Sequence, residues 1–171
     1  ASGDAITIET TSTTTTATVL NALDGKTSVA VDADAITAIT GGLAAGATMA
    51  GSSGLTLKSD YTFGATDAAT TTGLVGNVAT IAADTTGTVT ATITGSGSLT
   101  AAQINSNLST GSSADALTVN LAAATVAATD ITGIDSKTGT AVVADNVTLI
   151  TGSVSEALAV VTAHGNSTVD M

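Results

Sequence analysis

The chain has no cysteine, no proline and no tryptophan, and its only aromatic residues are one tyrosine and one phenylalanine. Without cysteine, a zinc site would have to use carboxylates around the single histidine, His164. Without large aromatic residues, the core has to be built from Ala, Val, Ile and Leu in thin layers with close backbone approach. Proline is usually abundant in disordered segments, so its absence, together with regularly recurring Val, Ile and Leu, predicts an ordered chain.

Basic residues are also scarce. Three lysines and no arginine stand against 14 acidic residues, which gives a net charge of −11. No basic face exists to neutralise phosphates, so nucleic acid is excluded as a partner, and binding to an anionic membrane surface is disfavoured. No apolar run approaches the ~20 residues of a membrane-spanning helix, so we expect no membrane insertion.

The chain does contain an internal repeat. Residues 23–41 return without a gap as residues 134–152, at an offset of 111, with 11 of 19 positions identical. Both copies contain Asp-x-Lys-Thr and end in Ile-Thr-Gly. That tripeptide begins at residues 39, 93, 131 and 150, and the last two intervals, 38 and 19, predict a structural unit of about 19 residues.

The segments between these motifs largely alternate apolar and polar residues, and threonine fits a half-buried strand. Short helices are expected after the Ile-Thr-Gly turns, with capping boxes at Thr100 and Ser153. We therefore predict a mainly β fold, a repeat-built, β-solenoid-like stack of short strands with a few short helices. The expected divisions are an N-terminal strand or linking segment, a first repeat, a degenerate second repeat and an incomplete third repeat, at residues 1–16, 17–76, 77–125 and 126–171.

Recurrent aspartates are the candidate metal ligands. Asp24 matches Asp135 and Asp34 matches Asp145 in the repeat, and Asp32 lies two residues before Asp34. Calcium takes oxygen ligands of this kind, which makes these five side chains weak calcium candidates. The nonapeptide of calcium-loaded β-rolls and the EF-hand loop are both missing, and a recurrent Asp in a repeat also caps turns by accepting from the backbone two residues on. Beyond calcium we expect no cofactor.

No catalytic constellation stands out. A Ser-His-Asp arrangement would have to recruit His164, and no Gly-x-Ser-x-Gly elbow sits between a strand and a helix, so we expect no enzyme. Tyr61 and Phe63 point the same way on a short strand. We interpret them as core of the first repeat rather than as a platform for stacking a sugar.

The repeat resembles a known group of sequences. Asp24 to Gly41 and Asp135 to Gly152, and more faintly Thr88 to Gly95, are similar to the Thr/Ala/Gly-rich repeats of very large surface proteins of marine cyanobacteria and of related phage structural and fibre proteins. The resemblance implies a non-catalytic, fibre- or coat-forming role outside the cell, at the cell surface or in a virion appendage. It supplies no catalytic residue.

These observations favour a structural subunit or segment of an extracellular filament, surface layer or appendage. Its partner would be the chain itself, joined through strand edges or repeat ends. The expected assembly residues are Ile6 and Ile8 in the N-terminal strand, and Val154, Leu158 and Val161 in a helix of the third repeat. The alternative is an adhesin or carbohydrate-binding module, such as a phage fibre segment, with a surface glycan as its partner.

Overall fold

The computed structural model describes residues 5–171 and shows an α/β fold. The described residues form six helices, α1 (Ala17–Asp24), α2 (Leu43–Ala50), α3 (Thr72–Asp84), α4 (Ala101–Asn107), α5 (Ala128–Asp135) and α6 (Val154–Gly165). The strands are β1 (Thr14–Thr16), β2 (Val31–Ala33), β3 (Ala38–Gly41), β4 (Leu55–Leu57), β5 (Thr62–Ala69), β6 (Val89–Thr94), β7 (Ala116–Asn120), β8 (Thr125–Ala127), β9 (Val142–Val143), β10 (Leu149–Thr151) and β11 (Val169–Asp170).

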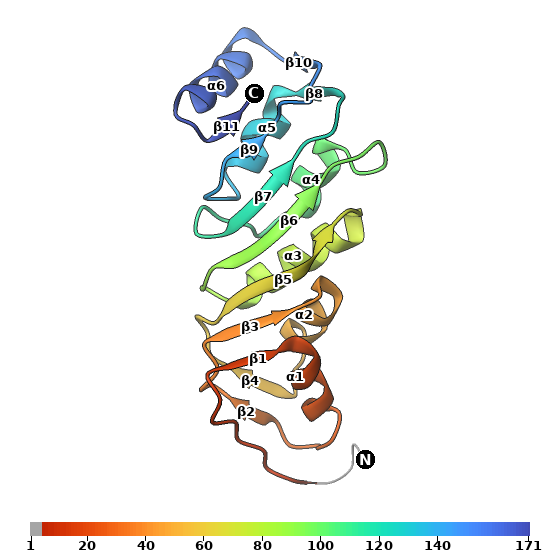
Figure 1. Ribbon diagram of the computed structural model, residues 1–171, viewed down its shortest axis with the longest axis vertical. Helices are drawn as coiled ribbons and strands as arrows, with labels where there is room; N and C mark the ends of the chain where they lie inside the picture. Colours follow the sequence, from red (N-terminus) through yellow and green to blue (C-terminus); the bar gives the residue numbers. More distant parts are fainter. Residues whose placement is uncertain (1–4) are drawn as a thin grey trace.

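All strand pairs in these sheets are parallel. The main sheet has seven strands in the order β1-β3-β5-β6-β7-β9-β11, and two small sheets pair β2 with β4 and β8 with β10. Because neighbouring strands follow chain order, the molecule is a stack that extends along one axis, with α2 to α5 behind the main sheet in Figure 1. Residues 5–13 and α6 lie at opposite ends of this axis.

The repeating unit of the stack is a helix followed by one or two strands. We call helix αn and the chain up to the next helix coil n, and the described residues before α1 coil 0. The helices begin at residues 17, 43, 72, 101, 128 and 154, so successive coils are 26 to 29 residues long. Each of the helices α1 to α5 packs against the helix of the next coil.

The prediction of a mainly β, β-solenoid-like fold is therefore wrong. Residues 72–84 form the longest helix, and four of its apolar residues, Val75, Val78, Ala79 and Ile81, are buried at helical spacing. The tripeptide Ile131–Gly133 lies inside α5, so the 19-residue interval that begins there is not a structural unit. The many threonines misled the prediction, because several of them cap or face outward from helices rather than extend strands.

The offset of 111 residues corresponds to four coils. α1 and α5 are both eight residues long, and they begin 111 residues apart. Lys26 N–H donates to Leu23 O over 2.9 Å, and Lys137 N–H donates to Ile134 O over the same distance. β1 and β8 also stand at this offset, so the structural repeat begins upstream of the matched sequence and relates residues 5–41 to residues 116–152.

The expected divisions fall differently against these elements. The boundary at residue 17 coincides with the start of α1, the one at residue 77 lies inside α3, and the one at residue 126 lies inside β8. Residues 1–4 of the expected N-terminal segment lie outside the described residues.

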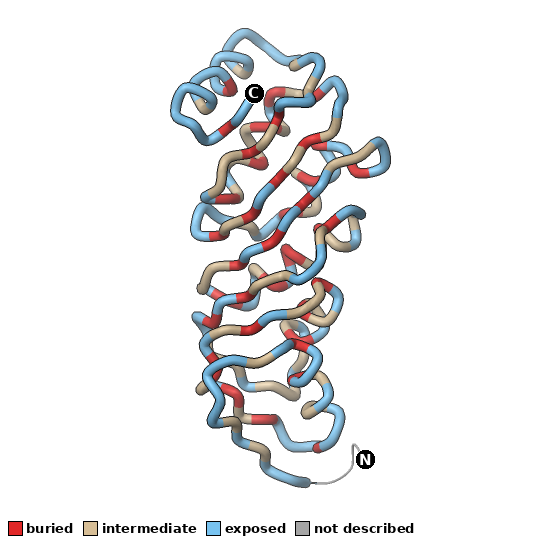
Figure 2. Tube along the Cα trace, in the orientation of Figure 1, coloured by how far each residue is buried: buried red, intermediate tan, exposed pale blue. Residues whose placement is uncertain are grey.

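The core lies between the main sheet and the helices. Burial alternates along the strands, as in β6, where every second residue is buried (Figure 2). Small residues let the two layers approach closely. A Cβ on Gly46 in α2 would lie 2.5 Å from the Phe63 ring of β5, so only glycine fits there. The fully buried large side chains come from both layers, and include Leu20, Ile39, Met49, Tyr61, Phe63, Ile81, Ile93 and Ile104.

Threonine hydroxyls bind each coil to the one before it. Thr138 Oγ1 donates to Leu117 O over 2.9 Å and accepts from Thr140 N–H over 3.1 Å. Thr27, its counterpart in the repeat, donates to Ile6 O over 2.6 Å and accepts from the N–H two residues on, also over 3.1 Å. Thr27 and Thr138 are almost fully buried.

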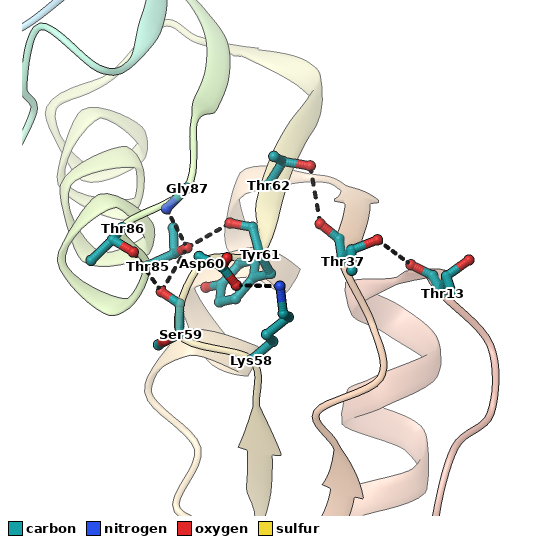
Figure 3. A network of polar contacts seen from close by, with 10 residues as sticks. All are labelled: Thr13, Thr37, Lys58, Ser59, Asp60, Tyr61, Thr62, Thr85, Thr86 and Gly87. Atoms are coloured by element: carbon teal, nitrogen blue, oxygen red, sulfur yellow. Dashed lines mark hydrogen bonds and ion pairs between the residues drawn. The ribbon is translucent and has the colours of Figure 1, made fainter.

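A second set of hydroxyl bonds appears in Figure 3. Thr37 Oγ1 donates to Thr13 O over 3.2 Å, and Thr62 Oγ1 donates to Thr37 O over 3.3 Å. Thr85 donates to Tyr61 O over 2.5 Å and accepts from Gly87 N–H over 2.9 Å. Threonine is therefore abundant here because its hydroxyl replaces a backbone partner at the bends between coils.

Candidate functional site

The aspartates that match in the repeat join neighbouring coils. Asp24 Oδ2 accepts from Ser52 Oγ over 2.8 Å, and Asp135 Oδ2 accepts from Thr168 Oγ1 over 3.2 Å. In each case the carboxylate at the end of a helix binds a hydroxyl of the following coil. Partial burial raises the pKa of Asp135 above its ordinary value, and the bond from Thr168 opposes that rise.

The five calcium candidates do not lie together. Asp24 and Asp135 stand four coils apart. Asp32 accepts from the N–H of Asp34 over 3.2 Å, which is the turn-capping bond, and Asp34 and Asp145 are exposed. Within residues 5–171, no three side chains of the His, Cys, Asp or Glu type are grouped to hold a metal. Asp24 and Asp135 thus have hydroxyl partners between coils, and Asp32 has a backbone N–H partner within its own turn.

The single histidine and the two aromatic residues have structural positions. His164 lies in the last turn of α6, with Nδ1 3.1 Å from Val169 O. Tyr61 and Phe63 are fully buried, which confirms their assignment to the core. The Tyr61 hydroxyl donates to Asp84 Oδ2 over 2.8 Å, and burial together with this carboxylate raises the Tyr61 pKa.

A shallow groove runs between helices α3 and α4. It is lined mainly by small residues, among them Ala50, Gly76, Ala79 and Thr80, and Thr110 bridges it by donating to Ala79 O. The bond from Thr110 joins the two sides of the groove, and the residues that line it form no cluster of reactive side chains.

The expected assembly residues of the third repeat form an exposed apolar face on α6. Val154, Leu158 and Val161 are 87%, 62% and 60% exposed. They lie on the side of α6 opposite Val160, which is buried against the rest of the stack. We call Val154, Ala157, Leu158 and Val161 the α6 face. The helix itself is well defined, because Ser153 and Glu156 form the predicted capping box.

The expected N-terminal residues lie at the opposite end of the stack. Ile6 is 55% exposed and Ile8 is half-buried. Residues 8–10 pair with β2 through a parallel bridge between Glu9 and Asp32. These residues belong to coil 0, so within the described residues no earlier coil pairs with their other edge.

Two neighbouring residues were missed by the sequence reasoning. Val19, which is 49% exposed, and Ala22 lie on the outer side of α1 at the same end as Ile6. They could have been found by extending the 111-residue offset upstream of residue 23, where Thr14/Thr125 and Ala17/Ala128 are identical pairs. We call Ile6, Val19 and Ala22 the N-terminal face.

The sequence matches no protein family model, no curated protein and no solved structure. None of the helices in residues 5–171 has the length and apolarity needed to cross a membrane.

Proposed function

We propose that the protein is a non-catalytic, self-associating structural module, a subunit or segment of an extracellular filament, surface layer or appendage. The support comes from the end faces of the stack, where apolar side chains are exposed at positions that are covered inside the stack.

The comparison of α6 with α2 carries this proposal. The two helices occupy equivalent places at an offset of 111, so Val154 corresponds to Leu43 and Val161 to Ala50. Leu43 is fully buried, and Ala50 is partly covered and lines the groove beside α3. The same side of α6 has no helix against it within the described residues. Exposed single apolar residues are common, but a contiguous face that is covered in its internal counterpart marks a contact surface.

The strand edges add to this surface. β1 and β11 are the outermost strands of the main sheet, and each has a neighbour on one side within the described residues. Such edges pair readily with other strands unless proline, lysine or a bulge blocks them. The chain has no proline and three lysines, none of them in these two strands.

A pair of matched double variants tests the proposal. Leu158→Glu with Val161→Glu places two charges on the α6 face, and we call it the C-blocked variant. Ser155→Glu with Ala159→Glu adds the same charge to exposed positions of α6, whose α2 counterparts, Ala44 and Thr48, are exposed too. We expect wild type and control to form concentration-dependent assemblies in sedimentation velocity and negative-stain images. The C-blocked variant should lose them.

A wild-type chain that stays monomeric at millimolar concentration would refute the proposal, as would equal association by both double variants. Circular dichroism of each variant establishes that the fold is retained, since all four substituted side chains are exposed.

An adhesin or carbohydrate-binding module finds no support in the site. Sugar sites usually stack a ring on an aromatic side chain, and the only two aromatic residues of the chain are in the core.

A further inference from the structure

We propose that the α6 face of one copy binds the N-terminal face of a second copy, so that copies join head to tail. This inference rests on the proposed self-association and adds its partner surface and its polarity.

The N-terminal face corresponds to a surface that receives a helix inside the stack. At an offset of 111, Val19 and Ala22 of α1 correspond to Asp130 and Gly133 of α5. Asn105 of the preceding helix, α4, contacts both, because its Nδ2 donates to Asp130 Oδ1 over 3.1 Å and a Cβ on Gly133 would lie 2.7 Å from it. The outer side of α1 is thus equivalent to a helix-binding side, and it carries valine and alanine where α5 has aspartate and glycine.

The segment that precedes β1 shows the same difference. Ile6 and Ile8 correspond to Leu117 and Val119 of β7, both fully buried. Ile6 is held in the equivalent backbone position, since its carbonyl accepts from Thr27 as that of Leu117 accepts from Thr138. Coil 0 therefore has this backbone contact in place and lacks, within the described residues, the cover that β7 has inside the stack.

The α6 face supplies the complementary side. Its residues correspond to those that α2 turns toward the next coil, where a Cβ on Gly46, the counterpart of Ala157, would lie 2.7 Å from Ile81 of α3. Successive helices of the chain thus make the same contact inside the stack. One helix contributes the side that faces the next coil, and the following helix contributes the side that faces the preceding coil. A head-to-tail contact between copies continues this interface, whereas a contact between like ends has no internal precedent.

Charge favours the same polarity. Lys26, one of three lysines, is exposed beside the N-terminal face, and its counterpart Lys137 donates to Asn105 Oδ1 of the preceding coil over 2.7 Å. At the other end, Asp170 of the edge strand is exposed. A head-to-tail contact keeps this lysine on the side where its counterpart meets the preceding helix, whereas contact between two C-terminal ends brings the two copies of Asp170 together.

The geometry of the sheet then determines the form of the assembly. Because all strands of the stack are parallel, its two ends are different surfaces. A contact between different surfaces is heterologous and leaves a free end on each side, so it propagates into a filament instead of closing into a dimer.

A complementation experiment tests the polarity. The N-blocked variant carries Ile6→Glu and Val19→Glu, and the C-blocked variant is the one defined above. Each alone should be monomeric, because every head-to-tail contact then includes one charged face. Mixed in equal amounts, they should form a dimer with about twice the monomer mass that grows no further, since only the intact N-terminal face of one and the intact α6 face of the other remain.

The outcomes separate this inference from the proposed function. Dimers of the N-blocked variant alone would show contact between two α6 faces, and dimers of the C-blocked variant alone would show contact between two N-terminal faces. Either result overturns the polarity and leaves self-association standing. Assembly that survives in both variants overturns the choice of surfaces, and a monomeric wild type overturns both proposals.

Discussion

Thr138 provides the sharpest test of how the coils are held together. Its hydroxyl donates to Leu117 O and accepts from Leu117 N–H over 3.0 Å, so one side chain satisfies both backbone groups of a buried residue in the preceding coil. The bond from Thr140 N–H fixes the turn in which Thr138 lies. Thr138→Val keeps the shape of the side chain and removes all of these bonds.

The magnitude follows from the groups that are left unpaired. The buried N–H of Leu117 and the lost bond to its carbonyl cost about 2–4 kcal/mol together. The additional buried methyl group of valine returns about 0.8 kcal/mol. We therefore expect Thr138→Val to lower the free energy of unfolding by about 1–3 kcal/mol. Thr118→Val is the control, because Thr118 is exposed on β7, and a change at such a position stays within about 0.5 kcal/mol.

Urea unfolding measures the difference, followed by far-ultraviolet circular dichroism and by the fluorescence of Tyr61, the only tyrosine. The C-blocked variant serves as the background, so that association does not contribute to stability. Coincident transitions by the two probes establish two-state unfolding, which repeat arrays do not always show. The reasoning fails if Thr138→Val unfolds within 0.5 kcal/mol of its parent, or if Thr118→Val costs as much.

Three further predictions concern single positions. Gly46→Ala should destabilise the fold by about 1–3 kcal/mol in urea titrations, because its Cβ meets the Phe63 ring, whereas Gly76→Ala, with open space around its Cβ, should stabilise it by up to about 1 kcal/mol. Tyr61→Phe should cost about 1–3 kcal/mol in the same assay, through loss of a bond to a carboxylate. Hydrogen bonds from the backbone and then the side chain of Ser153 lower the pKa of Glu156, so its stabilisation of α6 is complete above the ordinary value of 4.5 and is lost as pH falls through the lower folded value. Hydrogen exchange of α6 amides should show this loss, and Glu156→Gln should remove it.

The parts of the fold that could be predicted are those for which the sequence signal lies within a few neighbouring residues. The capping boxes at Thr100 and Ser153 identified the starts of α4 and α6, because a hydroxyl and a carboxamide or carboxylate three residues later satisfy the exposed N–H groups reciprocally. The fold class was not predictable in this way. α1 and α5 have no capping box and are eight residues long, so their helical state depends on packing against the sheet.

The candidate site could be predicted only in part, because some of its features have no local signal in the sequence. The apolar stripe of α6 could be read from its spacing, but its exposure could not, because Leu43 in the equivalent place of α2 is fully buried. The coil length was hidden as well. Single coils share little sequence, and similarity appears only after four of them, so a period of 26 to 29 residues had no direct signal.

The residues on the outer face of α6 support the proposed contact. Terminal units of repeat proteins that face solvent carry polar outer surfaces. α6 does the reverse, since Leu158 and Val161 stand where the covered helix α2 has Ala47 and Ala50. Larger apolar side chains at an exposed end cost solubility, yet they increase the area available to a partner. The same holds for Val19, where the interior helix α5 has an aspartate. At Val19, Leu158 and Val161 the two ends thus carry larger apolar residues in place of small or polar ones, which is the pattern expected of two surfaces that meet.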